Sequence, residues 1–563
     1  MKHFIKAHFG SLLLAGVILS VALLASVLLF AQGPQPSDDA YITFRHVRNL
    51  LEHGIPAWNL HSKPVMGSTS PAFLFGLALF AKLTNLEISR AAFALNVGLM
   101  FGIVLLAYLA ARDLLQKRFA ALLASILIGI NSVNISIFSE GFESALFVLA
   151  SFAALYAVRQ RQDILSLVLA SLAPLIRPEG IFLSVLVWIA LVIEKRFRWK
   201  LIPAYSLLPA LWLAFSLWYY GSPVPNSIRA KTMLPAMYAP YQGTEVKLLN
   251  RLPQLPLALA ELWNSKVEPL LLQGYYYEAI TLRNVFRTPL WKKTLLALAV
   301  LSWLAALLDT FKRKDTRFVY LLYAPLLLVF YAWIGHVLPW YFPPLITFSI
   351  LSLWAGCLFA AQRFGQWLLR FKKSLPRGLT LRLGFYAGFA LVIFSTFLMT
   401  NRYAFLQKKH WHGGPEIFLA PLPRRDNLRN MERDRFLVYR QAAEYLNRQS
   451  QNPGTALITE VGVFGYYYRG EVLDSLGLCS PEVFPFYPPP IHDTKNRNGK
   501  KYNANTIVPT ALVMSLQPDY VINSAGYIEN LIQADSPFRQ KYQWIGEAGM
   551  VWEAWVMIFE KNK

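Results

Sequence analysis

The chain has 563 residues, of which 55% are hydrophobic and only 15% are charged, and its formal net charge is +23. Soluble domains carry about 25% charged residues, so this composition excludes a wholly soluble protein but leaves room for one soluble domain of ordinary size. The Lys and Arg residues occur in short clusters between apolar runs, as in membrane proteins with positive cytoplasmic loops, and no basic helix indicates binding of nucleic acid.

The first apolar run covers residues 11–31 and follows a basic N-terminus. The apolar core of a cleaved signal is about 7–15 residues long, whereas a membrane span needs about 20. We therefore expect an uncleaved signal anchor whose basic end lies in the cytoplasm. The polar segment 32–70 follows and contains Asp38 and Asp39. The next apolar run, 71–83, is short for a span, so we expect it to lie along the outer surface or dip into it.

Ten further apolar runs are predicted to cross the membrane in alternating directions, which places the strong basic clusters inside. Their expected bounds are 91–111, 119–138, 144–158, 164–176, 181–193, 201–220, 293–310, 318–334, 344–360 and 383–400. Together with the anchor they give about eleven spans, and two of the middle ones are short.

The C-terminal region, residues 401–563, is richer in charge and proline, and no spanning run remains in it. A helical period covers 433–448. Short strands are expected at 455–459, 520–523 and 555–560, with short helices at 462–468 and 528–533 between them. Alternation of strands and helices predicts a small α/β domain.

The predicted fold is a mainly α, polytopic helical membrane protein with a C-terminal extracytoplasmic α/β domain. Residues 1–400 form the membrane module, which has a first outer loop at 32–90 and a long outer loop at 221–291. Residues 401–563 form the outer domain, on the same side of the membrane as the Asp pair.

Asp38 and Asp39 have two interpretations. They precede an expected helix that starts near Tyr41, and Asp is favoured at helix N-termini, so the pair can be purely structural. The functional interpretation gains support because other polar clusters return to the same face of the membrane. These clusters are Glu140 with Glu143, Arg177 with Glu179, residues 222–231 and residues 336–344. Charged residues at membrane depth are candidates for function, and anchoring at the interface is the alternative.

Transfer of a sugar from a phosphate ester fits these residues. The acceptor hydroxyl needs a base within hydrogen-bond reach, and a single carboxylate suffices for displacement with inversion. The charge on the leaving phosphate must be stabilised by cations. The candidates for this role are Arg177, Arg229 and Lys231, and then Arg45 and His336. A divalent cation such as Mg or Mn is a possible further partner of the phosphate, with no ligands assigned.

Seven stretches carry a resemblance to a known class. They are DDAYITFRHVRNLLEHGIPAWNL (38–60), GSTSPAFLFGLALFAKL (67–83), GFESALF (141–147), LIRPEG (175–180), YYGSPVPNSIRAK (219–231), PWYFPP (339–344) and TEVGVFGYYYRGEVLDSLGL (459–478). In this order they resemble the GT-C membrane glycosyltransferases, which use polyprenyl-phosphate sugars as donors. The amino-acid sequences of these stretches are similar to those of bacterial arabinofuranosyltransferase-type and mannosyltransferase-type members.

The resemblance implies roles for individual residues. The catalytic carboxylate maps to Asp39 or Asp38, with a slight preference for Asp39. A second acidic group, for the acceptor or a metal, maps to Glu143, with Glu140 beside it. Arg177 is expected near the donor phosphate. Three aromatic residues within the matching stretches are expected in the substrate pocket: Tyr41, Trp340 and Tyr341.

The implied activity is that of an inverting hexosyl- or pentosyltransferase on the outer face of a bacterial cytoplasmic membrane. Its partners are a polyprenyl-phosphate-linked sugar, membrane lipid, and a hydroxyl of a cell-envelope glycan, lipid or protein. A lipid or sugar transporter or flippase is the alternative, although such carriers place ionisable residues near the bilayer midplane, where these spans have almost none. A non-catalytic subunit of wall assembly is a third interpretation.

Three further features have less weight. His410 and His412 lack a third ligand nearby and are expected in a surface loop. No disulfide is expected between Cys357 and Cys479, and no zinc spacing occurs. The aromatic run 466–468 suits either stacking on a sugar or anchoring at the interface, and the sequence leaves both open.

Overall fold

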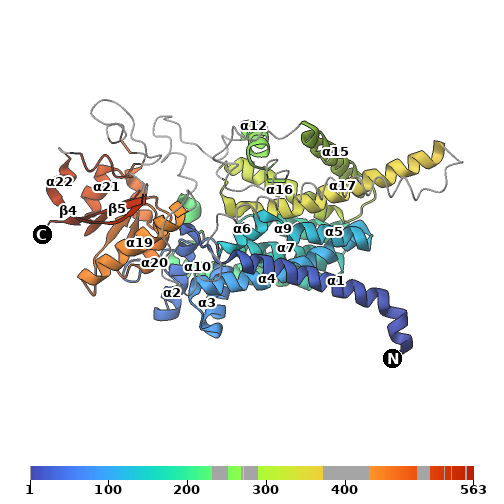
Figure 1. Ribbon diagram of the computed structural model, residues 1–563, viewed down its shortest axis with the longest axis horizontal. Coiled ribbons are helices and arrows are strands. Elements are labelled where there is room, and N and C mark those ends of the chain that lie inside the picture. The colour runs from blue at the N-terminus through green and yellow to red at the C-terminus, as the bar shows by residue number, and fades with distance from the viewer. Residues whose placement is uncertain are drawn as a thin grey trace. The chain divides into compact units, whose positions relative to one another are not determined.

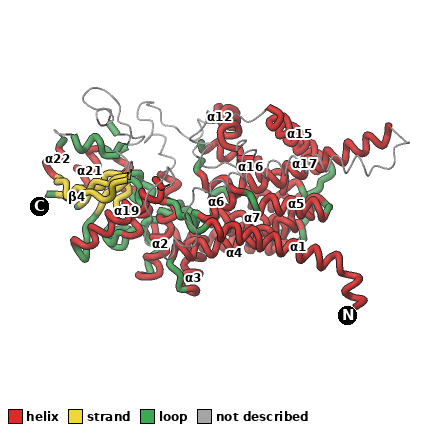
Figure 2. The backbone as a smooth tube through the Cα atoms, viewed as in Figure 1, coloured by secondary structure: helices red, strands yellow, loops and turns green. Residues whose placement is uncertain are grey.

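Helices make up most of the structure, and the strands among the described residues all lie in the C-terminal region (Figure 2). The computed structural model describes residues 2–230, 252–267, 270–271, 290–335, 337–371, 430–487, 489–490, 493, 507–524, 527–533, 536–551 and 554–562. The chain divides into two compact units. Unit 1 comprises Met1–Gln35, Ala92–Ala210 and Arg251–Ala420, and unit 2 comprises Pro36–Ala91, Leu211–Asn250 and Pro421–Lys563.

Unit 1 is built from apolar helices (Figure 1). They are α1 (Lys2–Gln32), most of α4 (Ile88–Leu115), α5 (Arg118–Gly129), α6 (Ser132–Ser139), α7 (Ser144–Arg159), α8 (Asp163–Ile176), α9 (Gly180–Ile193), the first part of α10 (Ile202–Tyr220), α12 (Leu255–Leu262), α15 (Leu290–Lys312), α16 (Phe318–Ile334) and α17 (Phe342–Phe371), with short η1 (Trp199–Leu201), η3 (Trp263–Val267) and η4 (Pro339–Tyr341). Every predicted span from 91–111 to 344–360 coincides with one of these helices or with the pair α5 and α6. The expected span 383–400 lies outside the described residues, as do His410 and His412.

Four helical stretches among the described residues are long and apolar enough to cross a membrane. They are Leu12–Gln32, Ile88–Leu115, Trp199–Tyr220 and Pro339–Arg363. The pair α5 and α6 meets the same test as one broken span, bent by 43°. Five more apolar helices are shorter, namely α3 (Pro71–Thr84), α7, α8, α9 and α16. The predicted polytopic helical fold is therefore confirmed, while the count of about eleven spans stays a prediction.

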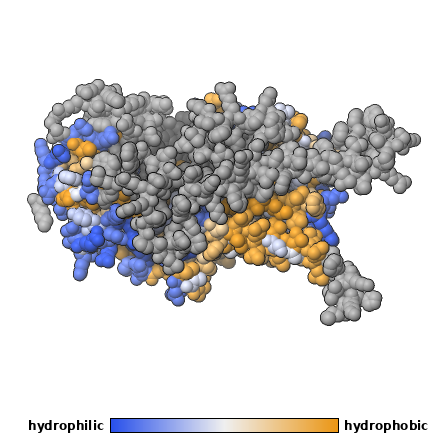
Figure 3. Space-filling model, in the orientation of Figure 1, coloured by the Kyte–Doolittle hydropathy of each residue, from blue (hydrophilic) through white to orange (hydrophobic). Residues whose placement is uncertain are grey.

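The surface of unit 1 has the character expected of helices in contact with lipid. Large apolar side chains are exposed along α1 and α10, for example Leu13 (60% exposed) and Leu207 (59%). In Figure 3, hydrophobic side chains cover the visible surface over α4 and the neighbouring helices of unit 1. In water such a surface would be strongly unfavourable, whereas lipid tails solvate it at little cost.

One half-buried charge network joins several helix ends of unit 1. Arg159, at the end of α7, pairs with Asp113 near the end of α4 at 2.8 Å and with Glu194 after α9 at 3.5 Å. It also approaches Asp315, just before α16, at 3.9 Å. The ends of α4, α7 and α9 and the start of α16 thus meet, as the predicted alternation of direction requires.

Unit 2 combines helices with a small mixed sheet. Its helices are α2 (Asp38–His53), α3, α19 (Asn430–Gln449), α20 (Gly462–Tyr467), α21 (Thr510–Leu516) and α22 (Pro537–Lys541), with a 3-10 turn η6 (Pro481–Phe486). Its strands are β1 (Ala456–Ile458), β2 (Val472–Asp474), β3 (Tyr520–Ser524), β4 (Tyr542–Val551) and β5 (Ala554–Lys561). The predicted α/β character is confirmed. The expected helix at 528–533 is a turn segment instead, in which the N–H groups of Leu531 and Ile532 both donate to the carbonyl of Ile528.

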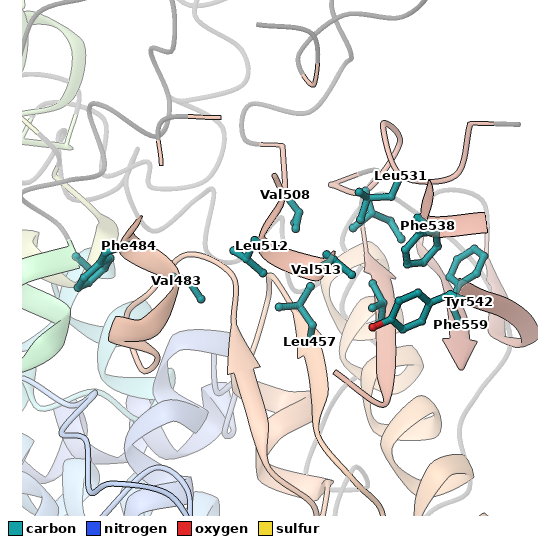
Figure 4. Packing of buried hydrophobic residues seen from close by; sticks show 13 residues of the cluster. Leu457, Val483, Phe484, Val508, Leu512, Val513, Leu531, Phe538, Tyr542 and Phe559 are labelled. Atoms are coloured by element: carbon teal, nitrogen blue, oxygen red, sulfur yellow. The ribbon is translucent and has the colours of Figure 1, made fainter. Parts of the chain in front are cut away.

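The sheet has the strand order β2-β1-β3-β5-β4. β1 pairs in parallel with β2 and β3, and β5 pairs antiparallel with β3 and β4. A core of apolar side chains packs beside it, as Leu457, Val513 and Phe538 illustrate (Figure 4). The carboxyl ends of β1 and β2 lead directly into residues 459–461 and 475–477.

The predicted first outer loop, from Pro36 on, and the C-terminal region, from Pro421 on, belong to the same unit. Asn59 forms two backbone bonds with Val472 on the sheet edge: its side-chain nitrogen donates to the carbonyl at 3.2 Å and its Oδ1 accepts from the N–H at 3.0 Å. Trp58 Nε1 donates to the same carbonyl at 2.9 Å. These side chains cover the otherwise open edge of β2.

Candidate functional site

Asp38 and Asp39 form the first turn of α2, so this helix begins three residues before the start expected near Tyr41. The hydroxyl of Ser37, at the N-cap, has no hydrogen-bond partner among the described residues. The Asp38 carboxylate accepts hydrogen bonds from a distant segment instead. Gly462 N–H donates to Oδ2 at 3.0 Å and Val463 N–H donates to Oδ1 at 2.7 Å. Asp38 therefore caps α20, a helix of the C-terminal region, through both of its oxygens.

The contact between α2 and α20 requires glycine at position 462. A Cβ atom on Gly462 would overlap the carbonyl oxygen of Asp38. Glycine has no Cβ and is the default residue where two backbones approach this closely. Any other residue at 462 would push α20 away from the Asp pair.

Arg45 is 2% exposed. Its guanidinium carbon lies over the ring of Trp58, 4.8 Å from the ring centroid. Its nitrogens donate to carbonyl oxygens: Nε to Trp58 (2.7 Å), Nη1 to Gly465 and Tyr468 (3.2 Å for Tyr468), and Nη2 to Gly470 (3.0 Å) and to Oδ1 of Asn59 (3.2 Å). A guanidinium has five N–H groups, and five acceptors surround this one. The expected role of Arg45 in phosphate binding therefore has no free donor in this arrangement.

Acidic groups crowd around the Asp pair. Burial, followed by the charge of Glu460, raises the pKa of Asp38 to about 7, against the opposing effect of the Val463 N–H. Burial also raises the pKa of Asp474, at the end of β2, to about 7, and the charge on Asp39 adds to this. Asp39 thus lies within electrostatic range of both carboxyl groups. A half-buried carboxylate beside partly protonated neighbours is well suited to accept a proton.

Tyr41 is buried in an aromatic cluster of unit 2. Its ring centroid is 5.3 Å from that of Tyr466 and 6.2 Å from that of Tyr467. The Tyr466 hydroxyl donates to Glu87 Oε1 at 3.0 Å. The rings of residues 466 and 467 therefore pack against α2, and Tyr41 is a packing residue beside the Asp pair.

A second cluster lies in unit 1 and contains the predicted Arg177, Glu143, Trp340 and Tyr341. Arg177 is 2% exposed, and its Nη1 contacts Glu143 Oε1 at 2.8 Å while its Nε contacts Glu179 Oε1 at 2.6 Å. Nη1 also donates to the carbonyl of Trp340 at 3.0 Å, and the guanidinium lies 4.6 Å from the Tyr341 ring centroid. The structure brings these residues together, but as an ion-pair network in which two carboxylates compensate the charge of the guanidinium.

The neighbours of this cluster are also packed. The Trp340 ring stacks on Phe142 with a centroid distance of 4.5 Å. Glu140 is half-buried and is the C-cap residue of α6. Tyr331 of α16 donates to Glu179 Oε1 at 2.9 Å. The RPEG turn is thus fixed to α7, α16 and η4.

Of the remaining predicted cations, Lys231 and His336 lie outside the described residues. Arg229 is exposed, and its guanidinium carbon lies 5.1 Å from the Phe484 ring centroid. Asn226 anchors this stretch, because its side chain donates to the carbonyls of Gly477 at 2.6 Å and Leu478 at 3.2 Å. Arg229 therefore belongs to the same unit as the Asp pair, and its segment is bonded to the loop that follows Asp474.

Among the described residues, no group of three or more His, Cys, Asp or Glu side chains is placed to hold a metal ion. The residues that sequence reasoning missed are Gly462, Val463, Glu460 and Asp474. The stretch at 459–478 was part of the resemblance, but nothing local indicates that its backbone amides bind Asp38, since 424 positions separate Asp38 from Gly462.

Comparison with known proteins adds the class of fold. Residues 426–559 match a family described as a domain of unknown function (DUF8728). No curated protein matches the chain. The solved oligosaccharyltransferase of Archaeoglobus fulgidus, tethered with an acceptor peptide containing the NVT sequon, superposes with a TM-score of 0.51 at 13% identity over 96% of this chain and 73% of that chain.

The archaeal oligosaccharyltransferase AglB from Archaeoglobus fulgidus, in complex with an inhibitory peptide and a dolichol-phosphate, gives a TM-score of 0.50 at 12% identity over 94% of this chain and 72% of that chain. The chain has a GT-C fold. ArnT from Cupriavidus metallidurans bound to undecaprenyl phosphate is a more distant match, with a TM-score of 0.46 at 14% identity over 98% of each chain. The predicted resemblance is confirmed at the level of the fold, and this protein is a multi-pass membrane protein.

Proposed function

We propose that this protein is an inverting glycosyltransferase. It moves a hexose or pentose from a polyprenyl-phosphate donor to a hydroxyl of a cell-envelope glycan, lipid or protein on the outer face of a bacterial cytoplasmic membrane. The observation that carries the proposal is the Asp38-Asp39 pair at the start of α2 in a chain with a GT-C fold. The solved relative that binds dolichol-phosphate supports the choice of donor.

The carboxylate of Asp39 is the proposed base. Asp38 binds the amides of Gly462 and Val463 through both oxygens, which gives it a structural contact with α20, and we assign the proton to the neighbouring carboxylate. The acceptor oxygen forms a bond to the anomeric carbon as its proton passes to Asp39. The bond between the anomeric carbon and the phosphate oxygen breaks, and its electron pair leaves with the phosphate. One displacement inverts the anomeric configuration, and no strong acid is needed because the leaving group is a weakly basic anion.

Cations must stabilise the phosphate as it leaves. Arg229 and Lys231 are the proposed ligands, since the segment around Arg229 is bonded through Asn226 to the loop after Asp474. Arg45 and Arg177 are left out of this role because their guanidinium groups are buried among other acceptors. A divalent cation remains a possible further partner, and activity measured with and without EDTA tests it.

Chemistry at the surface, rather than passage through the membrane, also accounts for the charge distribution. The described helices α7, α8, α9 and α16 have no Asp, Glu, Lys or Arg between their end residues. Ion-coupled carriers usually place such residues near the bilayer midplane. The transporter alternative predicts movement of the intact lipid-linked sugar across a vesicle membrane with no release of polyprenyl phosphate.

The test uses the full chain in lipid nanodiscs with a panel of undecaprenyl- and decaprenyl-phosphate-linked pentoses and hexoses. Mass spectrometry follows the release of polyprenyl phosphate, which is a product whatever the sugar. We expect release from at least one donor, and a loss of about 100-fold or more in Asp39→Asn, in line with removal of a general base. Glu52→Gln, an exposed change on the same helix, is the matched control. Full activity in both Asp39→Asn and Asp38→Asn would rule out this assignment.

A further inference from the structure

We infer that Asp38 and Arg45 are positioning residues that bind the two ends of α20 and thereby fix Asp39 in place. This inference deepens the proposed function and rests on it for the role of Asp39. It assigns to the C-terminal region a direct part in building the reaction site, and it gives Arg45 a role other than phosphate binding.

The first end of the contact is the N-terminus of α20. The N–H groups of Gly462 and Val463 are among those that a helix leaves without an internal partner. They donate to the two oxygens of Asp38 at 3.0 and 2.7 Å. A carboxylate is also the favoured charge at this end of a helix, where the partial charge of the backbone is positive.

The second end is the C-terminus of α20. The Arg45 guanidinium donates to the carbonyl oxygen of Gly465, in the last turn of α20, and to that of Tyr468, the residue after it. It also donates to the carbonyl oxygen of Gly470 beyond them. A cation is the favoured charge here, where carbonyl groups lack internal partners. Arg48, three residues further along α2, donates to the carbonyl of Tyr466 as well.

The spacing on α2 matches the length of α20. Asp38 and Arg45 are seven residues apart, which corresponds to about 10 Å along a helix that rises 1.5 Å per residue. α20 has six residues and is about 9 Å long. The two helices therefore run in the same direction, with opposite charges of α2 at opposite ends of α20.

Small residues allow this close approach on the facing side of α20. A Cβ on Gly462 would overlap the Asp38 carbonyl oxygen, and a Cβ on Gly465 would lie 2.7 Å from Trp58 Cη2. Trp58 in turn stacks with Arg45 and donates to Val472 on the sheet edge. Movement of α20 would therefore displace the first turn of α2 and the sheet edge together.

The consequence concerns Asp39. Its backbone follows directly from a residue that is bonded through both carboxylate oxygens, so its position is set by α20. Its charge also acts on Asp474, which ends β2 in the same unit. A base must be placed within about 3 Å of the proton it accepts, so a shift of the first turn by a fraction of an ångström matters for rate.

The first experiment tests the contact between α2 and α20 without a measurement of activity. Hydrogen exchange with mass spectrometry is measured on the full chain in nanodiscs for peptides covering 36–46 and 460–470. We expect about tenfold faster exchange in both peptides for Gly462→Ala and for Arg45→Met. Gly76→Ala is the matched control, because a Cβ at this exposed helical position meets nothing within 4 Å. Unchanged exchange in both peptides of both variants would overturn the inference, whatever the activity.

The second experiment separates positioning from mere stability. We expect Arg45→Lys to lower kcat about tenfold or more with the donor KM nearly unchanged. The compact ammonium group of lysine cannot reach all the oxygen atoms that surround the planar guanidinium of Arg45. Asp38→Asn keeps one acceptor oxygen, so we expect it to retain more activity than Asp39→Asn and to keep the shape of the wild-type pH profile.

The outcomes distinguish this inference from the proposed function. A raised donor KM with unchanged kcat in Arg45→Lys would indicate a phosphate ligand and would overturn the positioning role. A flat pH profile in Asp38→Asn, together with full activity in Asp39→Asn, would make Asp38 the base and would also overturn it. If no donor releases polyprenyl phosphate, the proposed function fails, and faster exchange in the variants would still establish the contact between α2 and α20.

Discussion

Arg177 and Glu143, which the sequence assigns to two different roles in the reaction, form a buried ion pair with 2.8 Å between Nη1 and Oε1. Arg177 is shared with Glu179 at 2.6 Å, and the three residues come from the start of α7 and the turn between α8 and α9. Removal of one partner from a buried pair leaves an uncompensated charge, which costs more than the pair itself contributes.

The first prediction concerns this ion pair. We expect Arg177→Met to destabilise the folded protein by about 3–5 kcal/mol, because the buried carboxylates of Glu143 and Glu179 then lose their shared counter-charge. The measurement is the midpoint of thermal unfolding in detergent, with Glu140→Gln at the half-buried end of α6 as the control. Equal midpoints for the two variants would contradict the buried network.

The second prediction concerns pH. Burial, together with the charge of Glu460, raises the folded-state pKa of Asp38 from its ordinary value of 3.8 to about 7. Between these two values the folded protein binds more protons than the unfolded chain, so this group stabilises the fold fully below about pH 4 and its contribution is lost as the pH rises to about 7. We expect the midpoint temperature of unfolding to fall as the pH rises from about 4 to about 7. In Asp38→Asn this midpoint should depend less steeply on pH.

Asp474 provides the internal comparison for this pH dependence, because burial raises its pKa to about 7 as well. Asp474→Asn should remove a further part of the slope. An unfolding midpoint that rises between pH 4 and pH 7 in the wild type, with the same slope in both variants, would contradict the raised pKa values.

The helices of unit 1 were predictable because hydropathy and basic clusters are local properties of the chain. The run 144–158 and the helix Ser144–Arg159 differ by one residue at one end. The sheet was partly predictable, because the apolar runs 455–459, 520–523 and 555–560 correspond to β1, β3 and β5. β2, which ends in Asp474, and β4, which contains two glycines, were not predicted, since Asp and Gly are unfavourable in strands.

The partners of the charged residues were not predictable in the same way. Arg45 has the appearance of an exposed basic residue on an amphipathic helix, yet it is buried by residues more than 400 positions away. Arg177 has one acidic residue, Glu179, two positions later in the sequence, but its second carboxylate comes from Glu143 at the N-cap of α7. Which acceptor satisfies a buried guanidinium depends on tertiary packing, and a single sequence carries no record of it.

The third prediction concerns the close packing of Gly67 against Cys479 in unit 2. A Cβ on Gly67 would overlap the sulfur of Cys479, which is 2% exposed. We expect Gly67→Ala alone to destabilise the protein by about 1–3 kcal/mol, as overpacking does. Cys479→Ala removes the sulfur, so the double variant should recover part of the loss. The measurement is a double-mutant cycle on unfolding midpoints, and additive effects would contradict the contact.

The fourth prediction tests the charge network of Arg159, whose side chain is 18% exposed and lies within 4 Å of three carboxylates. We expect Arg159→Met to lower the unfolding midpoint by several degrees, because Asp113 and Glu194 then repel each other at a site with little water.

The matched control for Arg159 is Arg313, whose side chain is 62% exposed and pairs with Asp309 at 2.9 Å. An exposed pair contributes about 0–1 kcal/mol, so Arg313→Met should leave the midpoint nearly unchanged. Adding Asp113→Asn to Arg159→Met should restore part of the midpoint, since it relieves the repulsion among the remaining carboxylates. If Arg159→Met and Arg313→Met behave alike, the Arg159 network does not hold the ends of α4, α7 and α9 together.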